Sequence, residues 1–261
     1  MGDAGLWLRD MTTGKLRKLS PGATHDQWPQ ITADGHLAGF SKLRPTIGDP
    51  WSYGILSLAD GGLREMAVKS WPGPWGLSPL GNYVISGGPG GGGRGLLALK
   101  VLSVGNGEQQ PFLEHPAWQL LSPHFSPDER WIAMHARNSE LTRQLFIVPF
   151  RFGQVTPQSE WIPITDGKSL DRDPVWSPDG NMLYWLADRE GQRGIWACKL
   201  DPATKRRVGE AFEVRMFRGA RRSMMKFGNT GMSRPAIARD KIVFALGEET
   251  GNIWTAKLPA N

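Results

Sequence analysis

Charged and aromatic side chains recur just ahead of several apolar stretches in this sequence. Tryptophan offers a ligand apolar surface, aspartate holds donor groups, and arginine pairs with a carboxylate. The candidates are Trp28, Trp71 and Trp118 for apolar contact, Asp26, Asp171 and Asp173 for donor groups, and Arg172 and Arg234 for a carboxylate. Packing against the core is the alternative for each tryptophan. The sequence therefore predicts a binding site, provided that the fold brings these positions together.

Motifs for catalysis and cofactor binding are missing from the sequence. Neither a Gly-x-Ser-x-Gly motif nor a His-Glu-x-x-His motif occurs. Gly88, Gly90 and Gly93 have the spacing of a dinucleotide-binding loop, but a short apolar stretch follows them where a helix would be needed. His25 and His124 could share a metal ion, although two scattered histidines are a weak signal. We expect no catalytic residue, no cofactor and no metal site.

A repeated phrase indicates which elements position the candidate residues. Residues 174–180 read Pro-Val-Trp-Ser-Pro-Asp-Gly, and weaker copies begin at Pro29, Pro74, Pro123 and Pro235. An apolar stretch follows every copy, and a second one comes after a loop. This spacing is typical of β-propellers, in which each repeat forms a four-stranded antiparallel blade. The sequence therefore predicts an all-β fold whose candidate residues lead into the innermost strands.

Four complete blades are predicted, over residues 24–70, 71–116, 117–167 and 168–217. A hairpin at residues 5–20 precedes them, and two further apolar stretches follow Pro235. Because an open propeller would leave strand edges exposed, we expect this hairpin to close the ring with strands from residues 235–258. Residues 1–261 then form a single domain of six blades, counting an incomplete or composite one. Five blades are the alternative.

The aspartates inside the repeated phrase have a structural explanation. An Asp-Gly pair between two strands supplies the positive φ that a tight turn requires, and proline fixes the approach of the chain. We therefore assign Asp34, Asp128 and Asp179 to turns and leave them out of the predicted site.

Composition excludes several classes of protein. The 261 residues include 12 tryptophans, 33 glycines and 20 prolines, which suits short strands joined by turns. The single cysteine, Cys198, cannot form an intramolecular disulfide and is expected in the core. The net charge of +6 is concentrated where exposed aromatics are missing, so we expect no nucleic-acid partner. The longest apolar runs are too short for membrane insertion, and we expect no signal peptide in this chain.

The repeat resembles one known family. Residues 174–180, 182–185, 188–191 and 195–196 are similar to the TolB-like, WD-repeat-like propellers, and the resemblance covers most of the chain. A narrower resemblance rests on residues 5–20, 160–165, 200–206, 221–223 and 247–254. These look like the C-terminal propeller that bacteria attach to Ser/Thr kinases or winged-helix regulators, which is a sensing or docking domain.

The repeated phrase, the aromatic candidates and the missing catalytic motifs together predict a non-enzymatic propeller that binds a protein, a peptide or a small ligand at the mouth of its channel. The narrower resemblance implies a sensing or docking role. It also implies a periplasmic location if the chain is an excised domain, although the sequence itself leaves the compartment unknown. A propeller enzyme is the alternative, either a metal-dependent uronate lyase or a glycosidase with carboxylates such as Asp171 and Asp173 in the channel. The repeated phrase alone does not separate these functions.

Overall fold

Nearly all the regular elements of this computed structural model are short strands. The structure describes residues 5–19, 25–43, 51–68, 74–89, 97–137, 142–189, 192–217, 222–223, 234–245 and 247–248. A 3-10 helix, η1 (Gln158–Glu160), is the one helical element in those residues. No helix in the described part of the chain has the length and apolar character that a bilayer crossing requires.

Four groups of four antiparallel strands form the body of the molecule, and we call each group a blade. The third and fourth blades join into one eight-stranded sheet through a single parallel pair, Arg143 with Leu170. The first two blades contain β3 (His25–Ile31), β4 (Leu37–Leu43), β5 (Trp51–Ser57), β6 (Leu63–Val68), and β7 (Pro74–Leu77), β8 (Tyr83–Pro89), β9 (Leu97–Ser103), β10 (Gln109–Leu113). The next two contain β11 (Gln119–Phe125), β12 (Trp131–Arg137), β13 (Arg143–Pro149), β14 (Ile162–Pro163), and β15 (Leu170–Trp176), β16 (Met182–Arg189), β17 (Gln192–Leu200), β18 (Arg207–Met216).

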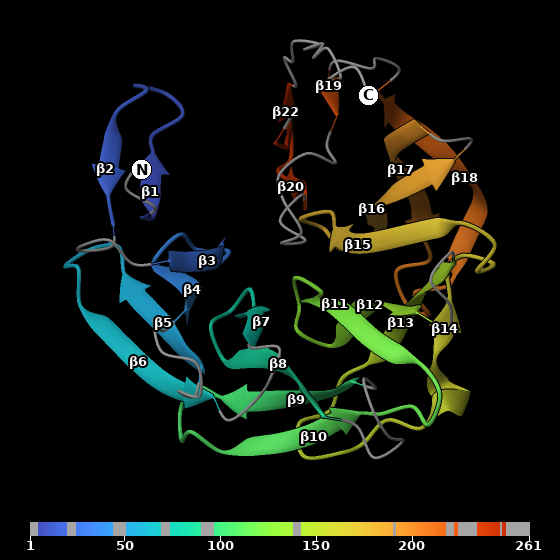
Figure 1. Cartoon of the computed structure of the whole chain (residues 1–261), viewed down its shortest axis with the longest axis horizontal. Helices are drawn as coiled ribbons and strands as arrows, with labels where there is room; N and C mark the ends of the chain where they lie inside the picture. The colour runs from blue at the N-terminus through green and yellow to red at the C-terminus, as the bar shows by residue number, and fades with distance from the viewer. Residues whose placement is uncertain are drawn as a thin grey trace, which may run out of the picture.

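The first strand of each blade lies nearest the central axis. Strand β3 contacts β7, β7 contacts β11, and β11 contacts β15, whereas β6, β10 and β18 lie on the outside (Figure 1). The inner strands all run in the same direction along the central axis, and we call the space around this axis the channel. The half of the channel beside the first four residues of β3, β11 and β15 is called the ring end, and the end with the turns of the repeated phrase the turn end.

The repeated phrase forms the turns that its residues predict. Asp34, Asp128 and Asp179 each accept a hydrogen bond from the backbone N–H two residues later, and each also accepts one from a hydroxyl two residues earlier. Gly35 and Gly180 have φ values of 74° and 68°, which residues with a side chain rarely adopt. Turn chemistry therefore explains these aspartates, as expected.

Large apolar side chains fill the spaces between neighbouring blades. Leu120 and Met134 pack with Phe112 between the second and third blades, and Trp176 and Trp185 anchor the cluster between the third and fourth. Cys198 is fully buried in the latter cluster, in agreement with its predicted place in the core. Burial of this kind fixes each inner strand against its neighbours, so the side chains that face the channel have defined positions.

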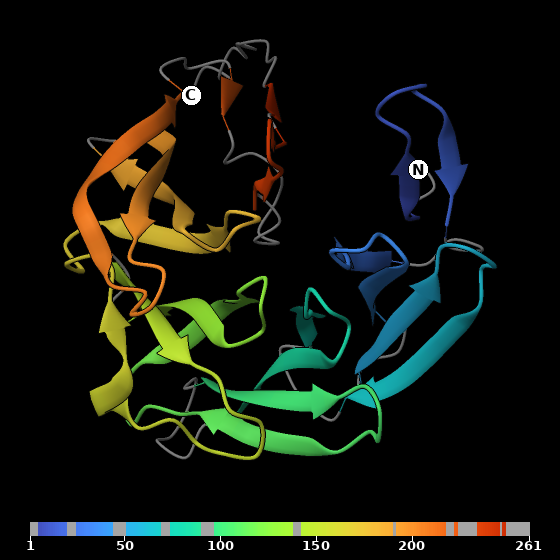
Figure 2. The ribbon, with the colours of Figure 1, turned by 180° about the vertical axis from the view of Figure 1, so that it is seen from behind.

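The two ends of the chain lie on either side of the arc of blades. The hairpin of β1 (Trp7–Arg9) and β2 (Leu16–Lys18) lies beside the first blade, and β20 (Ala236–Ile237) contacts β15 of the fourth (Figure 1, Figure 2). In the described residues β1 pairs only with β2, β20 with β21 (Ile242–Val243), and β19 (Arg222–Ser223) with β22 (Gly247–Glu248). Residues 246 and 249–258 of the predicted closing strands lie outside that part, so ring closure and the number of blades stay predictions.

Candidate functional site

A backbone irregularity recurs in the inner strands. The pairing register shifts between Gln27 and Gln30 in β3, between Leu121 and His124 in β11, and between Arg172 and Val175 in β15. Such a shift is a β-bulge, which turns a side chain away from the regular alternation of a strand. The bulges in β3, β11 and β15 lie at the same place in their repeats and include the residue before the proline, whereas the register of β7 shifts one step later, between Pro74 and Gly76.

The residues at these bulges share an unusual conformation. Trp28, Ser122 and Asp173 have φ values of 52°, 50° and 54°, which cost free energy for residues other than glycine. Each directly precedes the proline of its repeat, and Arg234 takes that place before Pro235. We call Trp28, Ser122, Asp173 and Arg234 the pre-proline ring. Four of the five repeats thus place a different side chain before their proline, and the repeat at Pro74 has a glycine there in the sequence.

Asp173 lies at the centre of a charged cluster. Its carboxylate accepts a hydrogen bond of 2.6 Å from the Ser122 hydroxyl on the neighbouring blade, and it lies 3.8 Å from the Arg172 Nε. Burial by itself would raise the pKa of this carboxyl, but the charges of Arg234 and Arg172 and the hydrogen bond from the Ser122 hydroxyl oppose it, and the pKa lies below its ordinary value. Asp173 is therefore an anion that binds the third blade to the fourth.

His135, on β12, is the other buried titratable group of the cluster. Its Nδ1 accepts a hydrogen bond of 3.4 Å from the Asp173 backbone N–H, and its side chain is almost fully buried. Burial lowers the pKa of His135 to about 3. The negative charge of Asp173 alone would raise this pKa, whereas the positive charges of Arg143 and Arg172 lower it further. The imidazole is therefore neutral near pH 7.

Partly buried arginines complete the cluster. Arg193, at the start of β17, lies 3.2 Å from the Asp188 carboxylate, and burial together with the charge of Arg172 lowers its pKa. Burial also lowers the pKa of Arg234, and the negative charge of Asp173 opposes this shift. Buried charges are costly and concentrate at functional sites, so this cluster is the candidate site.

Asp171 faces a different environment from Asp173. Its side chain is fully buried, and its Oδ1 accepts hydrogen bonds from the Trp185 Nε1 at 3.0 Å and the Arg189 Nη2 at 3.4 Å. Burial raises the pKa of this carboxyl, with Arg189 opposing the shift. The Arg189 guanidinium in turn lies 4.1 Å from the centre of the Trp196 ring. These contacts hold the fourth blade together, and the binding role predicted for Asp171 is untested.

Two of the predicted aromatic residues, Trp28 and Trp118, pack against different partners. Trp28 packs against Trp75 with ring centres 5.7 Å apart, and Trp118 stacks on His115 at 4.2 Å. Trp118 also packs against the core between the second and third blades, which is the alternative that the sequence allows. Asp26 lies near the start of β3, opposite Lys42 on the neighbouring strand β4. Trp71 lies outside the described residues.

Three members of the cluster were not predicted as site residues. Ser122, His135 and Arg193 come from β11, β12 and β17, and only Ser122 carries a signal in the sequence, since it precedes a repeat proline as Asp173 does. The other two reach the cluster through contacts between strands. No group of three His, Cys, Asp or Glu side chains that could hold a metal ion occurs in the described residues.

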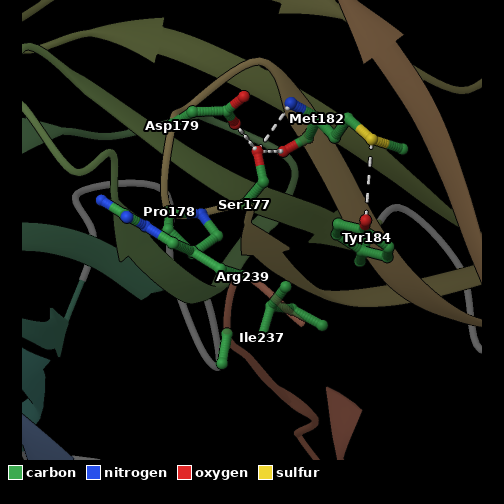
Figure 3. A pocket seen from close by; sticks show the side chains of 8 residues that line it. Ser177, Pro178, Asp179, Met182, Tyr184, Ile237 and Arg239 are labelled. Atoms are coloured by element: carbon green, nitrogen blue, oxygen red, sulfur yellow. Dashed lines mark hydrogen bonds between the residues drawn. The ribbon is translucent and has the colours of Figure 1, made fainter. Parts of the chain in front are cut away.

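A hollow of about 460 Å³ lies at the turn end instead, between the fourth blade and the last repeat (Figure 3). Ser177, Asp179 and Tyr184 line it on one side, and Ile237 and Arg239 on the other. The Ser177 hydroxyl bonds within its own turn, to the Asp179 carboxylate and the Met182 carbonyl. The polar groups on that side thus serve the turn, and the hollow is separated from Arg172 by roughly the length of β15, about 20 Å.

Comparison with known proteins identifies the fold. No protein-family model matches the chain, and no curated protein matches it. The crystal structure of TolB from Acinetobacter baumannii is similar with a TM-score of 0.57 and 18% identity, covering 79% of this chain and 50% of that one. An oligogalacturonate lyase in complex with manganese has a TM-score of 0.55 and 16% identity, covering 82% and 59%. A puromycin-hydrolyzing peptidase from Mycobacterium tuberculosis has 0.54 and 14%, covering 74% and 32%.

At these identities the likeness concerns the fold alone, which is that of TolB-like β-propellers, as the sequence predicts. The chain spans only half of the TolB structure's length and about three fifths of the lyase's. The similar structures include enzymes, so the fold leaves the function of this chain open.

Proposed function

We propose that this TolB-like propeller is a non-enzymatic binding module, which docks a protein, a peptide or a small ligand at the ring end of its channel. The charged cluster around Asp173 is the observation that carries the proposal. Arg172, Asp173 and Arg234 come from two separate repeats and act on one another through space. A propeller needs no such buried charges for its fold, because the turn chemistry and the apolar clusters already specify the blades.

The finer role that we propose is sensing or docking within a larger signalling or envelope protein. The support is the resemblance of the sequence to the propellers attached to bacterial Ser/Thr kinases and winged-helix regulators. In such a role the bound partner would be read out by a neighbouring domain. A rigid propeller suits this purpose because the bulges hold the ring side chains in place.

A thermal-shift screen tests the proposal on the whole chain. The probes are short peptides and oligosaccharides of both charges, in the presence and absence of Mn²⁺. A ligand at 100 times its Kd stabilises the native state by about 2.7 kcal/mol, which raises the Tm by about 5–10 °C for a chain of this size. We expect at least one probe to raise the Tm of the wild type and to lose this effect in Arg234→Ala.

The matched control is Arg239→Ala, because Arg239 is an exposed arginine five residues further along the same repeat. This variant should respond to the probe as the wild type does. Mass spectrometry of the recovered probe separates binding from catalysis. An unchanged probe supports a binding module, whereas a cleaved product would establish the enzymatic alternative. The absence of any shift, or a shift that persists in Arg234→Ala, would disprove the proposed site.

A further inference from the structure

The charged cluster contains more positive than negative charge. Arg143, Arg172 and Arg234 all act on His135, and Arg172 also acts on Arg193. Arg143 has a further interaction of its own and is not counted in the balance. Two carboxylates, those of Asp173 and Asp188, oppose the three guanidinium groups of Arg172, Arg193 and Arg234. Asp171 does not alter the balance, because it pairs with Arg189. An excess of one positive charge remains in a partly buried setting, where charge is expensive to hold.

A hydrogen-bond donor in the same cluster has no partner. The Nδ1 of His135 accepts from the Asp173 backbone, so a neutral ring carries its proton on Nε2. The side chain is only 2% exposed, and its Nε2 makes no hydrogen bond in the described part of the chain. A buried donor without a partner costs about 1–3 kcal/mol. An acceptor that reached this atom would recover that free energy.

We propose that the ring end of the channel binds a carboxylate, with Arg172 and Arg234 pairing with its oxygens and the His135 Nε2–H donating to it. The inference rests on the proposed binding function and names the chemistry of the ligand. The cluster already holds one carboxylate, that of Asp173, between Arg172 and the Ser122 hydroxyl. A guanidinium presents paired donors that match a planar carboxylate, and a second monoanion leaves no net negative charge beside Asp173.

The carboxylate could end a peptide or belong to a uronic acid, and calorimetric titration distinguishes these sources. One pair of probes is a tripeptide with a free C-terminus and its C-terminal amide. The other pair is a galacturonate trimer and its methyl ester, and inorganic phosphate is titrated alone. We expect one of the two carboxylate forms to bind the wild type at least tenfold more tightly than its neutral counterpart. This difference corresponds to about 1.4 kcal/mol, within the range of a charge-assisted hydrogen bond.

Variants then locate the bound carboxylate. Arg172→Gln and Arg234→Gln should each reduce the affinity for the carboxylate form at least tenfold and leave that for the neutral form unchanged. Arg239→Gln is the control that should change neither. The comparison of paired probes on the wild type needs no variant, so it remains decisive even if a substitution prevents folding.

The outcomes separate the inference from the function on which it rests. If a neutral form binds as tightly as its carboxylate, the channel binds ligands but the inference is wrong. Tighter binding of phosphate than of either carboxylate would overturn it as well. If no probe binds while the protein remains folded, both the inference and the proposed function fail.

Discussion

Two groups of strained residues lie at opposite ends of the channel. The residues other than glycine with a positive φ, among those described, are Trp28, Ser122 and Asp173 at the ring end and Glu129 and Lys205 at the turn end. Each such conformation costs about 1–3 kcal/mol. The backbone strain is similar in both groups, but the surroundings of the side chains are not.

The residues at the turn end act as structural ties. Glu129 takes the place that Gly180 has in the next repeat, and its carboxylate accepts hydrogen bonds from the Leu80 backbone N–H at 2.7 Å and the Asn82 side chain at 2.9 Å. This joins the second blade to the third. Lys205 donates a hydrogen bond of 2.8 Å to the Gly180 carbonyl within the fourth blade. The strain there is offset by contacts within the protein.

The ring end is not satisfied in this way. Asp173 lies among more positive charge than it neutralises, and the His135 Nε2 lacks a partner among the described residues. Strain therefore identifies positions that the fold constrains tightly, whereas unsatisfied polar groups distinguish a candidate binding site from a structural tie. Changes of pH and single substitutions at each end can test whether the two ends really differ in this respect.

Acid should act first at the two buried histidines of β11 and β12, of which His135 belongs to the ring end, and should give the largest effect. Burial lowers the pKa of both His124 and His135 to about 3. As the pH falls below about 6.5, the unfolded chain binds protons at these histidines while the folded chain does not, so the folded state loses stability until the pH nears 3. The loss is about 1.4 kcal/mol per pH unit for each histidine. Urea unfolding at a series of pH values measures this slope.

Substitutions distinguish the contribution of the histidines to the pH dependence of stability from that of the turn aspartates. His124→Gln and His135→Gln should each remove about 1.4 kcal/mol per pH unit from the slope above pH 4. The pKa values of Asp34, Asp128 and Asp179 are lowered, chiefly by hydrogen bonds, so the stability that these aspartates contribute is lost only below the ordinary carboxyl range. An unchanged slope above pH 4 in the double histidine variant would contradict the prediction.

Removal of the central carboxylate should have the next largest effect. Asp173→Ala leaves Arg172 and Arg234 without their anion and Ser122 without its acceptor, so we expect the free energy of unfolding to fall by about 3–5 kcal/mol. Ser122→Ala removes only the hydrogen bond to the Asp173 carboxylate and should cost less, about 1.5–3 kcal/mol. Urea unfolding near pH 7 measures both. Equal losses in the two variants would show that charge at the ring end is unimportant for stability.

Glu129 provides the corresponding test at the turn end. Glu129→Gly relieves the backbone strain but leaves the Leu80 N–H and the Asn82 amide without their acceptor. Because hydrogen bonds to charged groups contribute about 1.5–3 kcal/mol each, we expect a net loss of about 2–3 kcal/mol after strain relief. Glu129→Gln, which keeps an acceptor, should lose less. A gain in stability for Glu129→Gly would mean that the tie between the blades does not stabilise the fold.

Much of the fold could be predicted because the repeat encodes local turn chemistry. The unit predicted at residues 168–217 agrees with β15–β18, which begin at Leu170 and end at Met216. Glu129 could not be anticipated, since a glutamate in a glycine position is favourable only through its contacts with the second blade. Contacts between blades join residues that are far apart in the sequence, so no local pattern reveals them.

The candidate site was predictable to a similar extent. Arg172, Asp173 and Arg234 were predicted because they lead into inner strands, and the cluster contains all three. Asp171 lies two positions from Asp173, yet a bulge separates their environments, and spacing alone does not reveal a bulge. His135 was missed because it belongs to a second strand and meets Asp173 only across the interface between blades.

The smallest expected effect belongs to a substitution that changes backbone strain alone, at a turn glycine. Gly35 has a φ of 74°, and a Cβ at this position would meet nothing within 4 Å. Gly35→Ala therefore adds backbone strain without a steric clash or a new tie, and we expect a loss of about 1 kcal/mol in urea unfolding. If the loss is this small, the larger effect of Glu129→Gly must come from its hydrogen bonds. A loss as large as that of Asp173→Ala would instead mean that backbone strain outweighs side-chain contacts at both ends, and the contrast between tie and binding site would disappear.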